Sequence, residues 1–224
     1  MKRILSLVLL GILALVTAAV PGDAKVKGIE KQKQEVMEVL KKFQAGYTAR
    51  DVSKLNDYVN ELFDPENVLI IGTSSYGPKK GEWCDDIKAV KDILTIDWKY
   101  WDDLILKVED ARVMIHENTA WVVMWGTSES KREKKEIYDW AVDAITKKIE
   151  QSKDDKTEER TRKIMFWVAQ HSIRWLLEYE KGGEKIVYPI RISAVLTKKK
   201  NKKWMFRQMD FAFPTQTVPD VRLD

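Results

Sequence analysis

The sequence is poor in the residue types that build metal centres and disulfides. Its 224 residues include one cysteine, Cys84, and two histidines, His116 and His171. A single cysteine can form no internal disulfide, and two histidines without grouped carboxylates fall short of the ligand sets of zinc or iron sites. We therefore expect no metal and no disulfide-stapled fold. Cys84, next to Trp83, is most simply a small buried side chain.

Nucleotide-binding motifs are also missing, and neither sign of charge is in strong excess. The chain contains no G-x-G-x-x-G and no G-x-x-x-x-G-K-[ST], so no nucleotide cofactor is indicated. Its formal net charge is only +4, which is too little to indicate a nucleic-acid partner. We expect a protein that uses no cofactor and binds no nucleic acid.

Only one long apolar run occurs, at the N-terminus. Lys2 and Arg3 precede the run 4–20, and small residues at 17–19 and 22–24 each suit a cleavage site. This layout is typical of a secretory signal peptide, so we expect residues 1–24 to be removed and the protein to be secreted or periplasmic. No stable membrane insertion is then expected. An uncleaved anchor is the alternative, because a run of this length reaches the lower limit for spanning a bilayer.

Residues 25–224 are expected to form one domain, since their length suits a single core. Apolar spacing predicts helices at 32–47, 51–65 and 83–98, with a short strand at 68–71. Strands are expected at 104–108, 111–115, 119–127, 186–196 and 204–213. Helices followed by mostly antiparallel strands indicate an α+β domain with the helices on one face of a sheet.

The segment at about 128–185 interrupts the run of strands. Helical spacing appears on both sides of a charged break at 152–159, which predicts a helical hairpin inserted between two strands. We expect this hairpin to dock on the domain through an apolar stripe. The stripe consists of Trp140, Ile145, Trp167, Val168 and Trp175.

Several short segments resemble the SnoaL-like branch of the nuclear transport factor 2-like superfamily. They are Ile70-Ile71-Gly72-Thr73, the loop leading into Gly81-Glu82-Trp83, Ala120-Trp121, Arg191-Ile192-Ser193 and the final Trp204 strand. The likeness covers about 32–127 and 188–214. It implies a cone-shaped, cystatin-like fold, in which a curved, mostly antiparallel sheet wraps around N-terminal helices and leaves a pocket, often in homodimers. Similar proteins include ketosteroid isomerases, polyketide cyclases and dehydratases, and also non-catalytic proteins.

The resemblance implies a pocket against the last two strands. Related domains carry polar residues, commonly His, His and Ser, after the Trp of the last strand, and Gln208, Asp210 and Ala212 hold the matching positions here. Arg191 and Ser193 fit the Arg and Thr of the preceding strand. The expected ligand-binding residues are therefore Arg191, Ser193, Gln208, Asp210, Tyr47, Trp121, Trp125 and Phe206. A ligand there is expected to direct an acidic or carbonyl oxygen at the guanidinium.

Purely structural roles stay open for these residues. Arg191 and Asp210 can form an ion pair that only fixes the sheet, and the tryptophans can simply fill the core. Of two possible functions, we favour non-catalytic binding of a small molecule or a partner segment, because Gln208 and Asp210 replace the histidines of the family. The alternative is an isomerase, cyclase or dehydratase in which Asp210 removes a proton next to a carbonyl, while Arg191 or Tyr47 stabilises the oxyanion.

Overall fold

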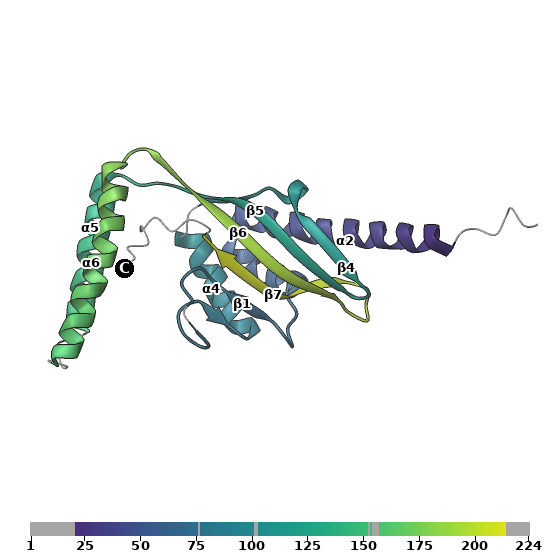
Figure 1. Cartoon of the computed structure of the whole chain (residues 1–224), viewed down its shortest axis with the longest axis horizontal. Coiled ribbons are helices and arrows are strands. Elements are labelled where there is room, and N and C mark those ends of the chain that lie inside the picture. Colours follow the sequence, from purple (N-terminus) through teal and green to yellow (C-terminus); the bar gives the residue numbers. More distant parts are fainter. Residues whose placement is uncertain (1–20, 76, 101–102, 152, 154–156, 214–224) are drawn as a thin grey trace, which may run out of the picture.

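The computed structural model describes residues 21–213, except 76, 101–102, 152 and 154–156 (Figure 1). The predicted signal peptide falls mainly on residues 1–20, which lie outside the described part, so it stays a prediction. Within the described range, no helix combines the length and apolar character needed to cross a membrane.

Helices form the first part of the chain, as the apolar spacing predicts. They are α2 (Pro21–Ala49), the 3-10 turn η1 (Val52–Lys54), α3 (Leu55–Leu62) and α4 (Ile87–Tyr100). The α2 residues Val36, Leu40, Phe43 and Tyr47 are buried, and they recur every three or four positions on one side of the helix. Asp51 caps the next turn by accepting a hydrogen bond from the Ser53 backbone N–H at 3.1 Å.

The strands form one seven-stranded sheet in the order β2-β1-β7-β6-β5-β3, with β4 also pairing with β5. All pairs are antiparallel except β1 with β7. The bounds are β1 (Leu69–Ile71), β2 (Trp83–Cys84), β3 (Asp103–Leu106), β4 (Arg112–His116), β5 (Thr119–Lys131), β6 (Lys185–Lys198) and β7 (Trp204–Ala212); a second 3-10 turn is η2 (Val108–Asp110). The predicted α+β architecture is confirmed.

The third helix starts later than its apolar spacing suggested. Trp83 and Cys84 are not helical, because they pair with Ile71 and Ile70 in the short strands β2 and β1. Asp86 then accepts a hydrogen bond from the Ala89 backbone N–H at 2.7 Å, which satisfies one of the free amides at the start of α4.

The core lies between the helices and one face of the sheet. Phe43 of α2 is its centre, with ring centroids 5.1 Å from Tyr47, 5.5 Å from Phe206 and 6.4 Å from Phe63. Such tilted and edge-on aromatic contacts add to the free energy gained by burying apolar area. The inner face of the sheet supplies, among others, Val122, Met124, Ile192, Leu196, Met209 and Phe211.

A β-bulge in β7 reverses the faces that the sequence predicted for this strand. Leu196 of β6 pairs with Phe206, but the preceding Val195 pairs with Gln208, so Arg207 is an additional residue in β7. Because neighbouring side chains point to opposite faces, one additional residue moves everything after it to the other face. Phe206 and Met209 are therefore both fully buried, while Gln208 is exposed on the outer face.

The two helices between β5 and β6 stand away from the sheet. They are α5 (Lys134–Glu150) and α6 (Glu158–Glu180), and Figure 1 shows them at the far end of the long β5–β6 ribbon. The ribbon is longer than predicted, since β5 continues to Lys131. The predicted docking stripe packs inside the hairpin instead: the Trp175 ring lies 5.5 Å from Trp140 and 5.8 Å from Trp167.

A glycine to alanine change tests the close approach of β3 and β5. A Cβ at Gly126 would lie 2.2 Å from the backbone oxygen of Ile105, which cannot move without disturbing the strand pairing. We expect Gly126→Ala to lower the free energy of unfolding by about 1–3 kcal/mol in urea denaturation. Gly28→Ala is the control, because a Cβ on this α2 residue meets nothing within 4 Å. It is expected to raise stability slightly, and equal losses in both variants would contradict the packing at Gly126.

Candidate functional site

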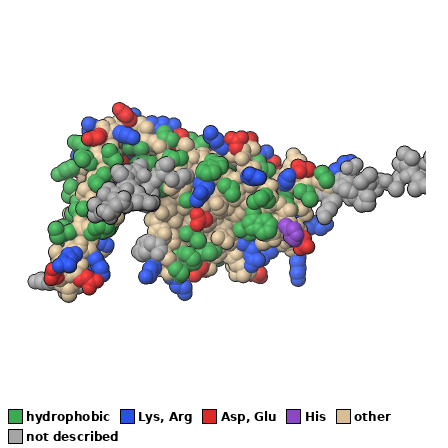
Figure 2. All heavy atoms as spheres, in the orientation of Figure 1, with side chains coloured by type: hydrophobic (Ala, Val, Ile, Leu, Met, Phe, Trp, Pro, Cys, Tyr) green, Lys and Arg blue, Asp and Glu red, His purple; other side chains and the backbone are tan. Residues whose placement is uncertain are grey.

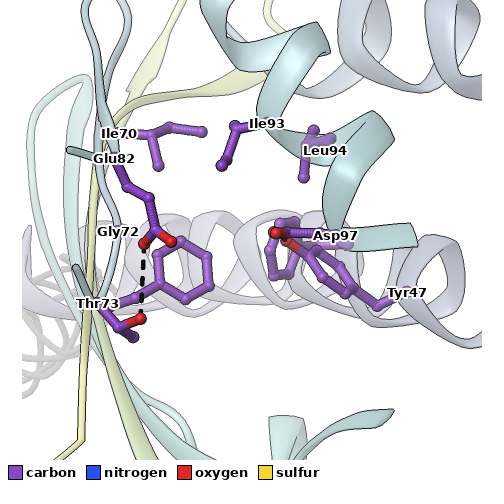
Figure 3. A pocket seen from close by; sticks show the side chains of 10 residues that line it. Tyr47, Ile70, Gly72, Thr73, Glu82, Ile93, Leu94 and Asp97 are labelled. Carbon is purple, nitrogen blue, oxygen red and sulfur yellow. Dashed lines mark hydrogen bonds between the residues drawn. The ribbon is translucent and has the colours of Figure 1, made fainter. Parts of the chain in front are cut away.

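A cavity opens between α2, α4, the β1–β2 loop and the end of β7. Its walls are partly aromatic and aliphatic, and its polar groups come from the two helices and the loop (Figure 3). The lining residues that matter for its chemistry are Tyr47, Gly72, Thr73, Glu82 and Asp97. Tyr47 lies near the end of α2 and Asp97 near the end of α4, while Gly72, Thr73 and Glu82 belong to the β1–β2 loop.

Tyr47 and Asp97 form a hydrogen-bonded pair on one side of the cavity. The Tyr47 hydroxyl donates to Oδ2 of Asp97 at 2.9 Å. Burial raises the pKa of Asp97 to about 6, and the nearby Glu82 adds to this effect, while the Tyr47 hydrogen bond and Arg50 act against it. Burial likewise raises the pKa of Tyr47 well above its usual value, so the phenol stays protonated and remains a donor.

Glu82 enters the cavity from the other side (Figure 3). Its Oε2 accepts a hydrogen bond from the Ser74 backbone N–H at 3.1 Å and a longer one from Thr73 Oγ1 at 3.5 Å. A Cβ at Gly72 would lie 2.2 Å from the same oxygen, so only glycine at this position leaves room for the carboxylate. The loop therefore both admits the acidic group and holds it in place.

The cavity is small and acidic. The space open to the centres of water molecules is about 30 Å³, and one water needs at least about 10–15 Å³ on this measure. Two carboxylates line it, and its lining contains no lysine, arginine or histidine. The aromatic rings of Phe43, Tyr47 and Phe211 complete its wall. This arrangement suits a small hydrogen-bond donor or a cation. Carboxylates accept hydrogen bonds from such groups, and aromatic faces also attract cations.

The structure places most of the residues predicted to line a pocket on the opposite face of the sheet. Arg191 and Gln208 are exposed, Ser193 pairs with Asp210 in the neighbouring strand, and all four side chains point away from the helices. The tryptophans Trp121 and Trp125 share this outer face, with 43% and 48% of their surface exposed. The expectation that these six side chains point into the cone is therefore wrong. In the last strand, the bulge at Arg207 explains why Gln208 and Asp210 point outward.

Two members of the predicted set do lie on the inner side. Tyr47 lines the cavity, and Phe206 is fully buried in the core behind it. The sequence reasoning missed Glu82 and Asp97. A signal for Asp97 was present, because it follows Ile93 by four positions and Leu94 by three, and so shares the inner stripe of α4. A carboxylate on an apolar stripe is a candidate for function.

The other reactive side chains in the described residues are weaker candidates for a functional site than this cavity. Among the residues that the structure describes, no three His, Cys, Asp or Glu side chains lie together in a way that could hold a metal ion. The Cys84 thiol is buried, and burial raises its pKa to about 11, with Glu82 contributing. A thiol with so high a pKa stays protonated and is a poor nucleophile.

Comparisons with known proteins identify the fold. No protein-family model matches the chain, and no curated protein matches it significantly. Among solved structures, an NTF2-like superfamily protein from Salmonella enterica covers 86% of this chain and 98% of its own, at 13% identity and a TM-score of 0.50. An NTF2-like protein with a cystatin-like fold from Novosphingobium aromaticivorans covers 90% and 94%, at 7% identity and a TM-score of 0.51.

A third similar structure, an NTF2-like family protein from Streptomyces avermitilis, covers 84% of this chain and 99% of its own, at 8% identity and a TM-score of 0.50. At such low identities these likenesses establish the fold alone. The chain has the NTF2-like, cystatin-like fold that the sequence resemblance predicted, and activity has to be argued from its own residues.

The raised pKa of Asp97 predicts how stability changes with pH. The pKa rises from 3.8 to about 6 on folding, so the folded state holds this proton more tightly, and the stability it contributes is present below about pH 4 and lost as the pH rises through 6. Asp97→Asn keeps an acceptor for Tyr47 and removes the titration. We expect the variant to gain up to about 3 kcal/mol over the natural protein at pH 8 relative to pH 4, measured by urea denaturation.

The matched control for this titration is Asp92→Asn. Asp92 lies on the same helix with 61% of its side chain exposed and pairs with Lys88 at the surface. Its replacement is expected to change stability by less than about 0.5 kcal/mol at either pH. A difference between Asp97→Asn and the natural protein that is the same at both pH values would contradict the burial of this carboxyl group.

Proposed function

We propose that this chain is an exported, non-catalytic binding protein of the SnoaL-like branch. Its cavity between α2, α4 and the β1–β2 loop takes the polar end of a small molecule or of a partner segment. The observation that carries this proposal is the hydrogen bond from the Tyr47 hydroxyl to Asp97 in a cavity of water-like size. This hydrogen bond supports binding over catalysis, because the donor, Tyr47, and the candidate base, Asp97, are already bonded to each other.

Removal of a proton next to a carbonyl requires both a free base and a donor for the developing oxyanion. Tyr47 is the neutral donor that points into the cavity, and its hydrogen goes to Asp97. A carbonyl substrate would have to separate this pair and find room for its own carbon skeleton. A cavity that holds one or two water molecules offers little such room without a rearrangement of its walls.

The acidic lining favours a positively charged end group. An ammonium group carries three N–H donors and is about the size of a water molecule. It can therefore donate hydrogen bonds to Asp97 and Glu82 together. This differs from the acidic or carbonyl ligand expected near Arg191, because that arginine lies on the outer face of the sheet. The ligand class that suits the cavity is therefore a primary amine, free or at the end of a lysine side chain.

An isomerase or dehydratase type of enzyme is the second candidate, and one observation favours it. Asp97 is a carboxylate in a partly apolar cavity with a pKa of about 6, as is common for general bases. In this alternative Asp97 takes the role that the sequence suggested for Asp210, which lies outside the cone. Proton exchange into a small ketone, lost in Asp97→Asn and kept in Asp210→Asn, is the signature of this activity.

Amine binding is tested by titrating the protein with n-butylammonium and, separately, with butyrate, while NMR signals of the cavity residues are followed. We expect chemical shift changes near Asp97 with butylammonium only, weakened at least about tenfold by Asp97→Asn and by Glu82→Gln. Binding should also weaken as the pH falls through 6, since Asp97 then becomes neutral.

Gly72→Ala and Asp92→Asn complete the amine experiment. The added methyl group displaces the Glu82 carboxylate without changing the charge of the protein, and so should weaken amine binding as Glu82→Gln does. Asp92→Asn changes charge at the surface of α4 and should leave binding unchanged. Equal affinity for butyrate and butylammonium would show that the two carboxylates do not select the ligand.

Export is tested by the intact mass of the protein recovered from the cell that produces it. The small residues at 17–19 and 22–24 predict that the mature chain starts at Val20 or Lys25. A mass that still includes residues 1–19 would contradict removal of the signal peptide.

A further inference from the structure

The α5–α6 hairpin carries an apolar surface that the rest of the described chain leaves exposed. Ten of the eighteen exposed large apolar side chains in the described residues lie on these two helices. Figure 2 shows apolar side chains gathered over the hairpin on the face in view. The ten are Tyr138, Trp140, Val142, Ile149, Met165, Phe166, Ile173, Leu176, Leu177 and Tyr179. So large a share on one projecting element indicates an interaction surface.

The hairpin first uses a separate set of residues to hold itself together. These seam residues are the buried or half-buried positions Ile137, Ala141 and Lys148 on α5, and Ile164, Val168 and Trp175 on α6. An aromatic contact reinforces the seam, with the Trp140 ring of α5 lying 5.5 Å from the Trp175 ring of α6. Apart from Trp140, the exposed apolar residues are therefore additional to those that form this seam.

Six exposed residues, three from each helix, lie on one broad face of the hairpin. Each of these six directly follows a seam residue, and one residue along a helix is a rotation of about 100°. The two helices run antiparallel and are both right-handed, so the same rotation from the seam leads to the same side of the pair. This side carries Tyr138, Val142 and Ile149 from α5, and Met165, Ala169 and Leu176 from α6.

The outer edge of α6 extends this face. Phe166, Ile173 and Leu177 are 66%, 46% and 41% exposed, and their spacing of seven and four places them on one line along the helix. Together with Ala169 and Leu176 they form an apolar stripe opposite the seam. A helix that is apolar on two opposite sides is typical of the interior of a bundle.

The root of the hairpin is fixed to the ribbon, so the apolar face has a defined direction. Glu178 of α6 is only 5% exposed and accepts hydrogen bonds from the Tyr188 hydroxyl at 3.1 Å and from Arg174 Nε at 2.9 Å. Arg132, at the end of the other ribbon strand, lies 3.7 Å from its second oxygen. A buried carboxylate with several partners resists movement, because loss of any partner leaves the charge unsatisfied.

We propose that the partner of this face is a second copy of the chain, so that two hairpins pack into a four-helix bundle. Each helix carries four basic and four acidic residues, so the hairpin has no net charge when His171 is neutral. Neutral hairpins do not repel each other, and they have no electrostatic attraction for anionic lipid headgroups. The two ends of α6 carry charges of opposite sign, Arg162 and Glu180, so two antiparallel copies of this helix are complementary.

The charges at the ends of α6 fix how the two copies meet. A two-fold axis between Ala169 and Ile173 sets α6 antiparallel to its copy, with Phe166 opposite the partner's Leu176. In this register Arg162 lies opposite the partner's Glu180, and the pair occurs twice by symmetry. Apolar residues therefore meet in the middle of the interface, and opposite charges meet at both of its ends.

Sedimentation of the purified chain tests this interface. We expect a dimer whose dissociation constant rises at least about tenfold with Ile173→Glu, because symmetry places two unpaired carboxylates in the centre of the bundle. Asn60→Glu is the control: Asn60 is exposed on α3, outside the hairpin, and its replacement adds the same charge but should leave the dimer intact. Circular dichroism of each variant checks that the helices are retained.

A charge exchange tests the antiparallel register. Arg162→Glu and Glu180→Arg should each weaken the dimer, since each places like charges opposite one another, and the double variant should restore it. A double variant as weak as the single ones would contradict the antiparallel arrangement.

Three outcomes would overturn the proposal. One is a chain that sediments as a monomer, and another is a dimer that survives Ile173→Glu and is lost in Trp125→Glu, which would place the interface on the outer face of the sheet. The third is a monomer that binds vesicles of phosphatidylcholine and phosphatidylglycerol in a flotation assay. Loss of this binding in Ile173→Glu would identify a membrane as the partner. Butylammonium binding measured on the same variants keeps this result separate from the function of the cavity.

Discussion

Strand β7 pairs with β6 in two registers that meet at the bulge at Arg207. Before the bulge, Phe206 faces the helices opposite Leu196, and after it the inward positions are Met209 and Phe211. The bulge therefore lets one strand contribute both aromatic rings to the core, although they are separated by an odd number of residues. The polar residues between them turn to the outside, which leaves the cone interior apolar except where the helices and the β1–β2 loop add carboxylates.

The long β5–β6 ribbon connects two parts of the molecule that face different surroundings. In the body of the sheet its inner residues, such as Val122 and Ile192, are buried under the helices. Beyond Gly126 the ribbon continues past the helices to Lys131, and the hairpin begins there. Backbone pairing along the whole ribbon lets it project without a flexible linker, and the Glu178 cluster then fixes the helices to its end.

The sequence predicted the elements better than it predicted the site. Helical and strand periodicity located the helices and the main strands, because each needs one apolar face, and the same periodicity revealed the hairpin. Periodicity cannot reveal a bulge, since an additional residue leaves the composition unchanged and reverses only the faces after it. That reversal moved Gln208 and Asp210 outside. Asp97 could have been found as a carboxylate on an apolar stripe, whereas Glu82 depends on the path of a loop beside Gly72.

The cavity and the apolar face of the hairpin use separate residues, so each can act without the other. The cavity is lined from α2, α4, β1, the β1–β2 loop and β7, while the hairpin is held by β5 and β6. Pairing of two hairpins therefore requires no change in the cavity. In the dimer that we propose, rigid ribbons would set the separation of two cavities. Two weak amine sites held in this way would bind a partner with several ammonium groups far more tightly than one site would, provided that its groups span the same distance.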